Sequence, residues 1–162
     1  MDLNQMHEQL RALTDRAAVE RLVTRYLRSL DEGPFDAAWA RTFFTDDAWS
    51  ETPVGVYEGI DAQLSSTGGA MALFERTVHF GTNLDVELDG DRAALRWNQL
   101  STHVLKEDGG PEGDGGARGE RLFVSGGHCE AEAVRSADGA WRFRRLALRI
   151  AWTQGRPPVL PA

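Results

Sequence analysis

The stretch that decides the fold is residues 79–104, HFGTNLDVELDGDRAALRWNQLSTHV. Residues 84–88 alternate apolar and polar side chains, which is the period of a β-strand. Asp89-Gly90 is a strong signal for a tight hairpin turn, and the return strand runs from Arg92 to about Lys106. The stretch therefore predicts two long antiparallel strands.

The return strand carries apolar or aromatic residues on both faces. Alternation places Leu95, Trp97, Ser101 and His103 on one face, and Ala94, Leu100 and Val104 on the other. A sheet coated on both faces either lies between helices and a partner or curls round an interior.

Two more strands follow towards the C-terminus. The first is expected from Glu120 to Arg135, after a polar, Gly-rich hairpin loop at 107–119. The second is expected from Trp141 to Trp152, after the tight turn Asp138-Gly139. Four antiparallel strands in a meander are therefore predicted.

The residues before 79 have a helical period instead. An apolar stripe predicts an amphipathic helix of about 17 residues or more, capped near Thr14 or Asp15 and ending at residues 31–34. The stripe consists of Leu10, Leu13, Val19, Leu22, Val23, Tyr26 and Leu30. A second helix is expected to open at Pro34 and end at residues 44–47.

The segment between the second helix and residue 79 is expected to be mixed. Residues 48–58 have β character, Gly59 starts a short helix, and residues 70–76 form a further helical turn or two. Helices followed by strands predict one α+β domain over residues 1–155, with a Pro-rich tail at 156–162.

Composition narrows the class of protein. The chain has 162 residues and a formal net charge of −7, which argues for one domain and against a nucleic-acid partner. Cys129 is the single cysteine, which fits a reducing compartment. The N-terminus lacks the features of a signal peptide, and no apolar run reaches the ~20 residues of a membrane span, so a cytoplasmic protein is expected.

Five short motifs occur in a specific order along the chain. They are Tyr26-x4-Asp31, the FTDDA run at 44–48, YEGI at 57–60, His79 before Asn83 and the LDGDRA hairpin at 88–93, and DGxWRF at 138–143. This order resembles the SnoaL-like branch of the nuclear-transport-factor-2-like superfamily, which includes scytalone dehydratase-like proteins, bile-acid dehydratases and polyketide cyclases. The resemblance implies a cone-shaped α+β barrel, in which N-terminal helices pack in a strongly curved antiparallel sheet around a pocket. It also implies acid/base chemistry without a cofactor in many members, whereas others are small subunits of dioxygenases.

Four residues are the candidates for catalysis. His79 opens the first long strand and can exchange a proton near pH 7, or it is a core histidine bonded to a carbonyl. Asp31 lies where the helix dipole disfavours a carboxylate, so it either orients His79 or His103 or caps the turn into Pro34. Tyr26 is either a hydrogen-bond donor in the pocket or a packed aromatic. The resemblance places a second catalytic histidine near His103.

Six further residues are candidates for the pocket wall. They are Trp49, Tyr57, Asn83, Trp97, Phe123 and His128. The resemblance calls for a second tyrosine; Trp49 stands about where it falls, and Tyr57 is the alternative that could substitute for it. Gly126-Gly127 before His128 suggests a bulge or the close approach of a ligand or chain, and His128 lines the pocket or faces a subunit neighbour. No tightly spaced metal-ligand motif is present, so neither a metal nor a cofactor is expected.

These residues favour a cofactor-independent lyase or isomerase, a dehydratase or cyclase acting on a small, apolar, possibly polycyclic carbonyl compound of secondary metabolism. His79 would remove a proton next to the carbonyl, Tyr26 would stabilise the enolate, and His103 could protonate a leaving hydroxyl. The alternative is a ligand-binding protein or a small subunit that supports a ring-hydroxylating oxygenase. In either case a homo-dimer or homo-trimer is expected, because Leu146, Leu148, Ile150 and Trp152 suggest an apolar outer face on the last strand.

Overall fold

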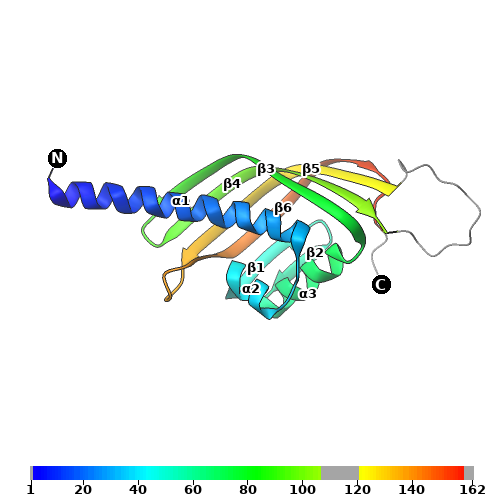
Figure 1. Ribbon diagram of the computed structural model, residues 1–162, viewed down its shortest axis with the longest axis horizontal. Coiled ribbons are helices and arrows are strands. Elements are labelled where there is room, and N and C mark those ends of the chain that lie inside the picture. Colours follow the sequence, from blue (N-terminus) through cyan, green and yellow to red (C-terminus); the bar gives the residue numbers. More distant parts are fainter. Residues whose placement is uncertain (1, 107–120, 159–162) are drawn as a thin grey trace, which may run out of the picture.

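A computed structural model describes residues 2–106 and 121–158. A long helix crosses one face of a curved sheet, and two shorter helices lie beside it (Figure 1). The elements, in chain order, are α1 (Leu3–Glu32), α2 (Ala37–Phe43), β1 (Phe44–Thr52), β2 (Gly55–Glu58), α3 (Ile60–Met71), β3 (Phe74–Asp89), β4 (Arg92–Leu105), β5 (Leu122–Arg135) and β6 (Trp141–Gly155).

The described strands form one six-stranded sheet in the order β2-β1-β6-β5-β4-β3. Strands β3 to β6 pair antiparallel with their sequence neighbours, so the predicted meander and the α+β class are confirmed. Strand β1 joins the sheet in parallel with β6, which the sequence pattern did not predict. The predicted loop at 107–119 lies outside the described residues.

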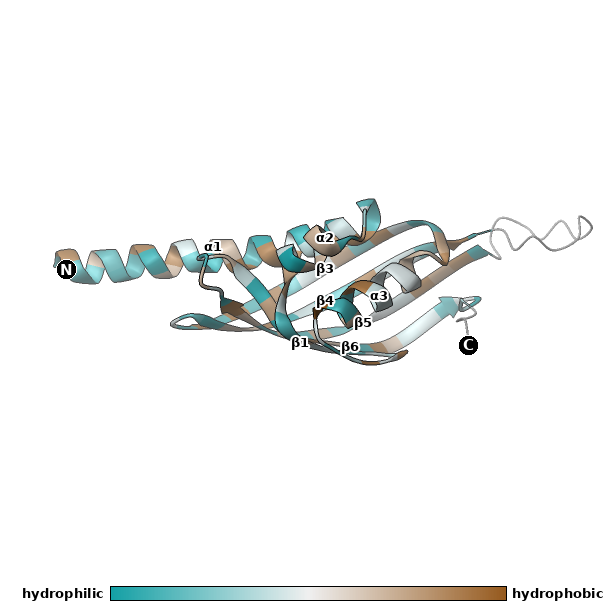
Figure 2. Ribbon diagram, turned by 90° about the horizontal axis from the view of Figure 1, so that it is seen from below, coloured by the Kyte–Doolittle hydropathy of each residue, from teal (hydrophilic) through white to brown (hydrophobic). Residues whose placement is uncertain are grey.

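Helix α1 is longer than predicted. It starts at Leu3 because Asp2 and Gln5 form a reciprocal capping box, so the predicted cap at Thr14 or Asp15 is wrong. Leu10 and Leu13 are exposed, because this part of the helix projects past the end of the sheet (Figure 1). In Figure 2 the projecting part alternates hydrophilic and hydrophobic residues along its length.

The predicted boundaries of the next elements also shift. Helix α2 begins after its N-cap Asp36 instead of at Pro34, and Phe44 already belongs to β1. Helix α3 is continuous to Met71, and β3 begins at Phe74, so the predicted helical turn at residues 70–76 is wrong. Local helix propensity in that segment is overridden because Phe74 pairs with Leu105 of β4 and is buried.

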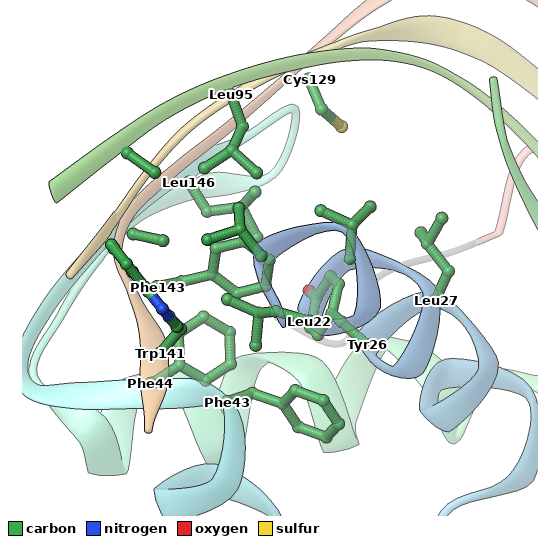
Figure 3. Packing of buried hydrophobic residues seen from close by; sticks show 14 of the residues in the cluster. Leu22, Tyr26, Leu27, Phe43, Phe44, Leu95, Cys129, Trp141, Phe143 and Leu146 are labelled. Atoms are coloured by element: carbon green, nitrogen blue, oxygen red, sulfur yellow. The ribbon is translucent and has the colours of Figure 1, made fainter. Parts of the chain in front are cut away.

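The core fills the space between α1, α2 and the concave face of the sheet (Figure 3). Gly81 of β3 lets the helix pack closely, since a Cβ atom at this position would lie 2.5 Å from Cδ1 of Leu27. This contact holds the C-terminal half of α1 against β3.

A bulge in the last hairpin decides which residues of β6 face inward. Gly127 pairs with Ile150 and Gly126 pairs with Trp152, so β6 has one extra residue at this point, as the paired glycines suggested. Leu146, Leu148 and Ile150 line the interior, so their predicted outer position is wrong. Trp152 lies outside, 50% exposed, and its ring covers Gly126.

No helix in the described parts of the chain has both the length and the apolar composition needed to cross a membrane.

Candidate active site

A cavity of about 420 Å³ lies between α1, α3, the β1–β2 turn and the concave face of β3 to β6. Exposed residues such as Val54 and Thr153 line part of its wall, so the cavity opens to the surface. The described lining is mostly apolar and includes no Lys, Arg, Asp or Glu. Such a cavity suits a small uncharged molecule.

His79 lines the cavity, and Asp31 forms a hydrogen-bonded pair with it from behind the lining. The last turn of α1 passes the start of β3, which brings Oδ1 of Asp31 to 2.6 Å from Nδ1 of His79. The carboxylate also accepts hydrogen bonds from the Thr77 hydroxyl at 2.7 Å and from the backbone N–H of His79 at 3.1 Å. Three donors therefore hold Asp31 in one orientation.

The pair determines the tautomer of His79. A carboxylate can only accept, so Nδ1 carries the hydrogen and Nε2 keeps its lone pair. The side chain of His79 is 3% exposed and lines the cavity, and within the described residues only Nδ1 has a hydrogen-bonding partner. This arrangement suits Nε2 to accept a proton from a bound molecule, with Asp31 stabilising the imidazolium that forms.

His103 lies on β4, edge-on to His79, with 5.4 Å between the ring centroids. Its ring is stacked between Phe74 and Phe123, and its Nδ1–H donates to the backbone oxygen of Phe123 at 3.1 Å. Burial, together with the charge of nearby His79, lowers the pKa of His103 to about 4. A neutral ring with its one hydrogen already donated offers an acceptor, so the geometry disfavours the predicted role of His103 as a general acid.

Tyr26 lies in the middle of α1 and lines the cavity. Its ring makes edge contacts with Phe43, Phe44 and Phe143. Burial raises the pKa of Tyr26 well above its usual value, so the hydroxyl keeps its proton. Among the described residues this hydroxyl has no hydrogen-bonding partner, which leaves it free to donate to a bound molecule.

The structure separates the predicted pocket residues into two groups. Tyr57 and Phe123 line the cavity. Trp97 is 2% exposed and belongs to the core, while Trp49 lies beneath the Arg145 guanidinium, whose central carbon is 4.5 Å from the centroid of the Trp49 ring.

Asn83 and His128 are exposed and lie away from the cavity, so their predicted role in the wall is not supported. On β5 the inward positions are odd-numbered, and His128 therefore points out, with its Nδ1 3.0 Å from Oδ1 of Asn98. Asn83 would be inward by alternation, but it adopts φ 56° at an irregularity in β3, and this shifts the alternation.

Sequence reasoning missed a polar group in the wall of the cavity. Oε1 of Gln99 accepts from Nε1 of Trp97 at 3.3 Å and from Sγ of Cys129 at 3.2 Å. Nε2 of Gln99 donates to Oγ of Ser101 at 3.2 Å. The alternation that placed Trp97 and Ser101 inward also places Gln99 there, so the signal was available. The described residues include no cluster of three acidic, histidine or cysteine side chains placed to hold a metal ion.

Comparison with known proteins identifies the family. A SnoaL-like domain model matches residues 11–147. No match was found among curated proteins.

Solved structures with the same fold include a candidate scytalone dehydratase from Novosphingobium aromaticivorans (TM-score 0.75, 22% identity, 93% of this chain and 94% of that chain covered). They also include the hexachlorocyclohexane dehydrochlorinase LinA-type3 from Novosphingobium barchaimii (TM-score 0.73, 22% identity, 95% of this chain and 98% of that chain covered). A third is a nuclear-transport-factor-2-like superfamily protein from Salmonella enterica (TM-score 0.72, 15% identity, 86% of this chain and 92% of that chain covered). At these identities the structures show a shared fold, and the family model covers most of the chain. The chain therefore belongs to the SnoaL-like domain family, with the fold of the nuclear-transport-factor-2-like superfamily.

Proposed function

We propose that this protein is a cofactor-independent acid/base lyase or isomerase, a dehydratase or cyclase acting on a small, uncharged and largely apolar carbonyl compound. The observation that carries the proposal is the 2.6 Å hydrogen bond from His79, which lines an apolar cavity, to Asp31 behind it. A carboxylate–imidazole pair of this kind is a common device for taking a proton from a substrate.

The proposed reaction begins when Nε2 of His79 removes a proton from a carbon next to a carbonyl. The electron pair of the broken C–H bond moves into the carbonyl and gives an enolate, and the Tyr26 hydroxyl donates a hydrogen bond to its oxygen. The enolate then collapses in one of three ways, and in each the imidazolium of His79 gives its proton back. A hydroxyl on the next carbon leaves as water with that proton, another carbon of the enolate takes the proton, or the enolate carbon attacks a second carbonyl to close a ring and the new alkoxide takes it. Neutral His103 accepts a hydrogen bond from the substrate and keeps it close to His79.

The composition of the cavity supports this class of substrate. Without a charged side chain in the described lining, an anionic substrate would enter an apolar space with no compensating charge. The volume of about 420 Å³ and the rings of Phe74, Phe123 and Tyr57 suit a planar molecule of one to three rings. A fold neighbour described as a hexachlorocyclohexane dehydrochlorinase adds support for an elimination from an apolar ring.

The proposal can be tested without the natural substrate. The probe is 1-tetralone in D₂O, with exchange of its α-hydrogens followed by NMR. The wild-type protein is expected to accelerate exchange, and His79→Ala is expected to lower the acceleration about 10²–10⁴-fold, since the proton acceptor is lost. His128→Ala is the matched control, because it removes an exposed imidazole on the opposite face of the sheet. Equal exchange by wild type and His79→Ala would exclude the proposed role of His79.

We also propose that the protein assembles as a homo-dimer or homo-trimer through the outer face of the sheet. Phe80, Leu100, Gly126 and Trp152 are successive cross-strand partners on that face. Phe80 is 48%, Leu100 37% and Trp152 50% exposed, which forms an apolar row. Light scattering of wild type and of Phe80→Asp is the test, and a monomeric wild type would contradict the proposal. We further propose a cytoplasmic location, which the buried Cys129 supports because it forms no disulfide.

A further inference from the structure

A row of hydroxyl side chains continues from His79 across the floor of the cavity. His79 of β3 pairs with Ser101 of β4, Ser101 pairs with Ser125 of β5, and Ser125 pairs with Thr153 of β6. Cross-strand partners project on the same face of a sheet, and all four residues line the cavity. We propose that Ser101 and Ser125 form a binding site for a neutral oxygen substituent of the substrate, remote from the carbon that His79 deprotonates.

The hydrogen bonds of Ser101 leave its proton available. Its Oγ already accepts from Nε2 of Gln99 at 3.2 Å, and Gln99 is itself held by Trp97 and Cys129. The serine hydroxyl can therefore donate into the cavity from an oriented position.

Ser125 is the stronger indication of a bound group. It is only 7% exposed, yet its hydroxyl has no hydrogen-bonding partner among the described residues. Its Oγ is not enclosed by protein atoms, because Ser125 borders the cavity, so the oxygen of a bound ligand can supply the missing hydrogen bond. Thr153 continues the row to the exposed end, where water can reach the hydroxyl.

The chemistry of the row defines the class of the bound group. Hydroxyls both donate and accept, so they match a hydroxyl or carbonyl oxygen. A carboxylate or phosphate would need a cationic partner, and the described lining has no Lys or Arg. The flanking row of His103 and Phe123 supplies aromatic contact on one side.

The spacing defines where that oxygen lies on the substrate. Neighbouring strands are about 4.8 Å apart, so Ser125 stands about 10 Å along the floor from the backbone position of His79. A two-ring compound fits, with its acidic carbon at His79 and an oxygen on the far ring at Ser125. This assignment of substrate class rests on the proposed function.

The test compares 6-hydroxy-1-tetralone with 1-tetralone, which lacks only the hydroxyl on the far ring. Dissociation constants are measured by calorimetry at about pH 6.5, where the hydroxyl is protonated. Wild type is expected to bind the hydroxylated ketone about 3- to 10-fold more tightly, the value of one hydrogen bond. Ser125→Ala is expected to remove this advantage and to leave the affinity for 1-tetralone within about two-fold, which also shows that the cavity is intact.

Ser66→Ala is the matched control. Ser66 lines the same cavity, but its hydroxyl already donates to the backbone oxygen of Gln63, so the variant should retain the advantage. The proposal is overturned if wild type shows no preference for the hydroxylated ketone, or if Ser125→Ala keeps it. His79→Ala separates the two proposals, because it should abolish α-hydrogen exchange and still prefer the hydroxylated ketone.

Discussion

Stability between pH 7 and pH 4.5 should depend on His103. Its pKa in the fold is about 4, against an ordinary value of 6.5, mainly because burial disfavours the charged ring. Between these values the unfolded chain binds a proton that the folded chain excludes. Folding is therefore weakened as the pH falls from about 6.5 to about 4, and the loss is complete below the lower value.

The size of the effect follows from the two pKa values. Linkage gives a loss of about 1 kcal/mol at pH 5.5 and about 2–3 kcal/mol at pH 4.5, relative to a chain without this histidine. The perturbation that isolates it is His103→Phe, because the ring lies between the rings of Phe74 and Phe123 and phenylalanine keeps that stacking. The variant also loses the hydrogen bond to the Phe123 carbonyl, which adds a cost that does not vary with pH.

The assay is urea unfolding followed by tryptophan fluorescence at about pH 7, 5.5 and 4.5. The free energy of unfolding of His103→Phe minus that of wild type should rise by about 2 kcal/mol over this range. His128→Gln is the control, since this exposed histidine should leave the pH dependence close to that of wild type. A constant difference between His103→Phe and wild type at all three pH values would refute the reasoning.

Three further outcomes are expected. Asp31→Asn should lower the rate of α-hydrogen exchange about 10²-fold or more, and should lower the free energy of unfolding in urea by about 2 kcal/mol. The reason is that an amide nitrogen cannot accept the hydrogen bonds that the carboxylate accepts. An unchanged exchange rate would contradict this prediction. Tyr26→Phe should lower the rate of α-hydrogen exchange about 10²-fold but change the free energy of unfolding by less than about 0.5 kcal/mol, since the hydroxyl has no hydrogen-bonding partner among the described residues. Equal exchange rates for wild type and Tyr26→Phe would exclude Tyr26 from the mechanism. Gly127→Ala should destabilise the fold by about 1–3 kcal/mol, because a Cβ there would lie 2.4 Å from the backbone oxygen of Arg149. Gly69→Ala in α3 is the control, since its Cβ meets no atom within 4 Å, and it should stabilise the fold by up to about 1 kcal/mol. Equal melting temperatures of the two variants would contradict this prediction.

Local patterns predicted the sheet well because alternation and turn chemistry act over a few residues. The hairpin at residues 89–90 and the turn at 138–139 determine where β3 to β6 begin and end, and the inward face of β4 followed directly from its period. The same alternation predicted that His79 and His103 share a face, but it could not show that Asp31 reaches His79.

Alternation failed where the backbone departs from a regular strand. The irregularity at Asn83 turned a predicted pocket residue outward, and the bulge at Gly126-Gly127 separated Trp152 from Leu148 and Ile150. One extra residue moves every later side chain to the other face, so an error of one position reverses a prediction of burial.

By itself the sequence determined the order of helices and strands, the turns between the long strands and the candidate acid/base residues, because each of these depends on neighbours in the chain. Only the tertiary structure decided that Asp31 binds His79 across 48 positions, that His103 is held neutral between two aromatic rings, and that a row of hydroxyls runs from His79 to Thr153. The physical reason is that these features depend on distance, burial and strand register, which arise only when segments far apart in the chain are packed together.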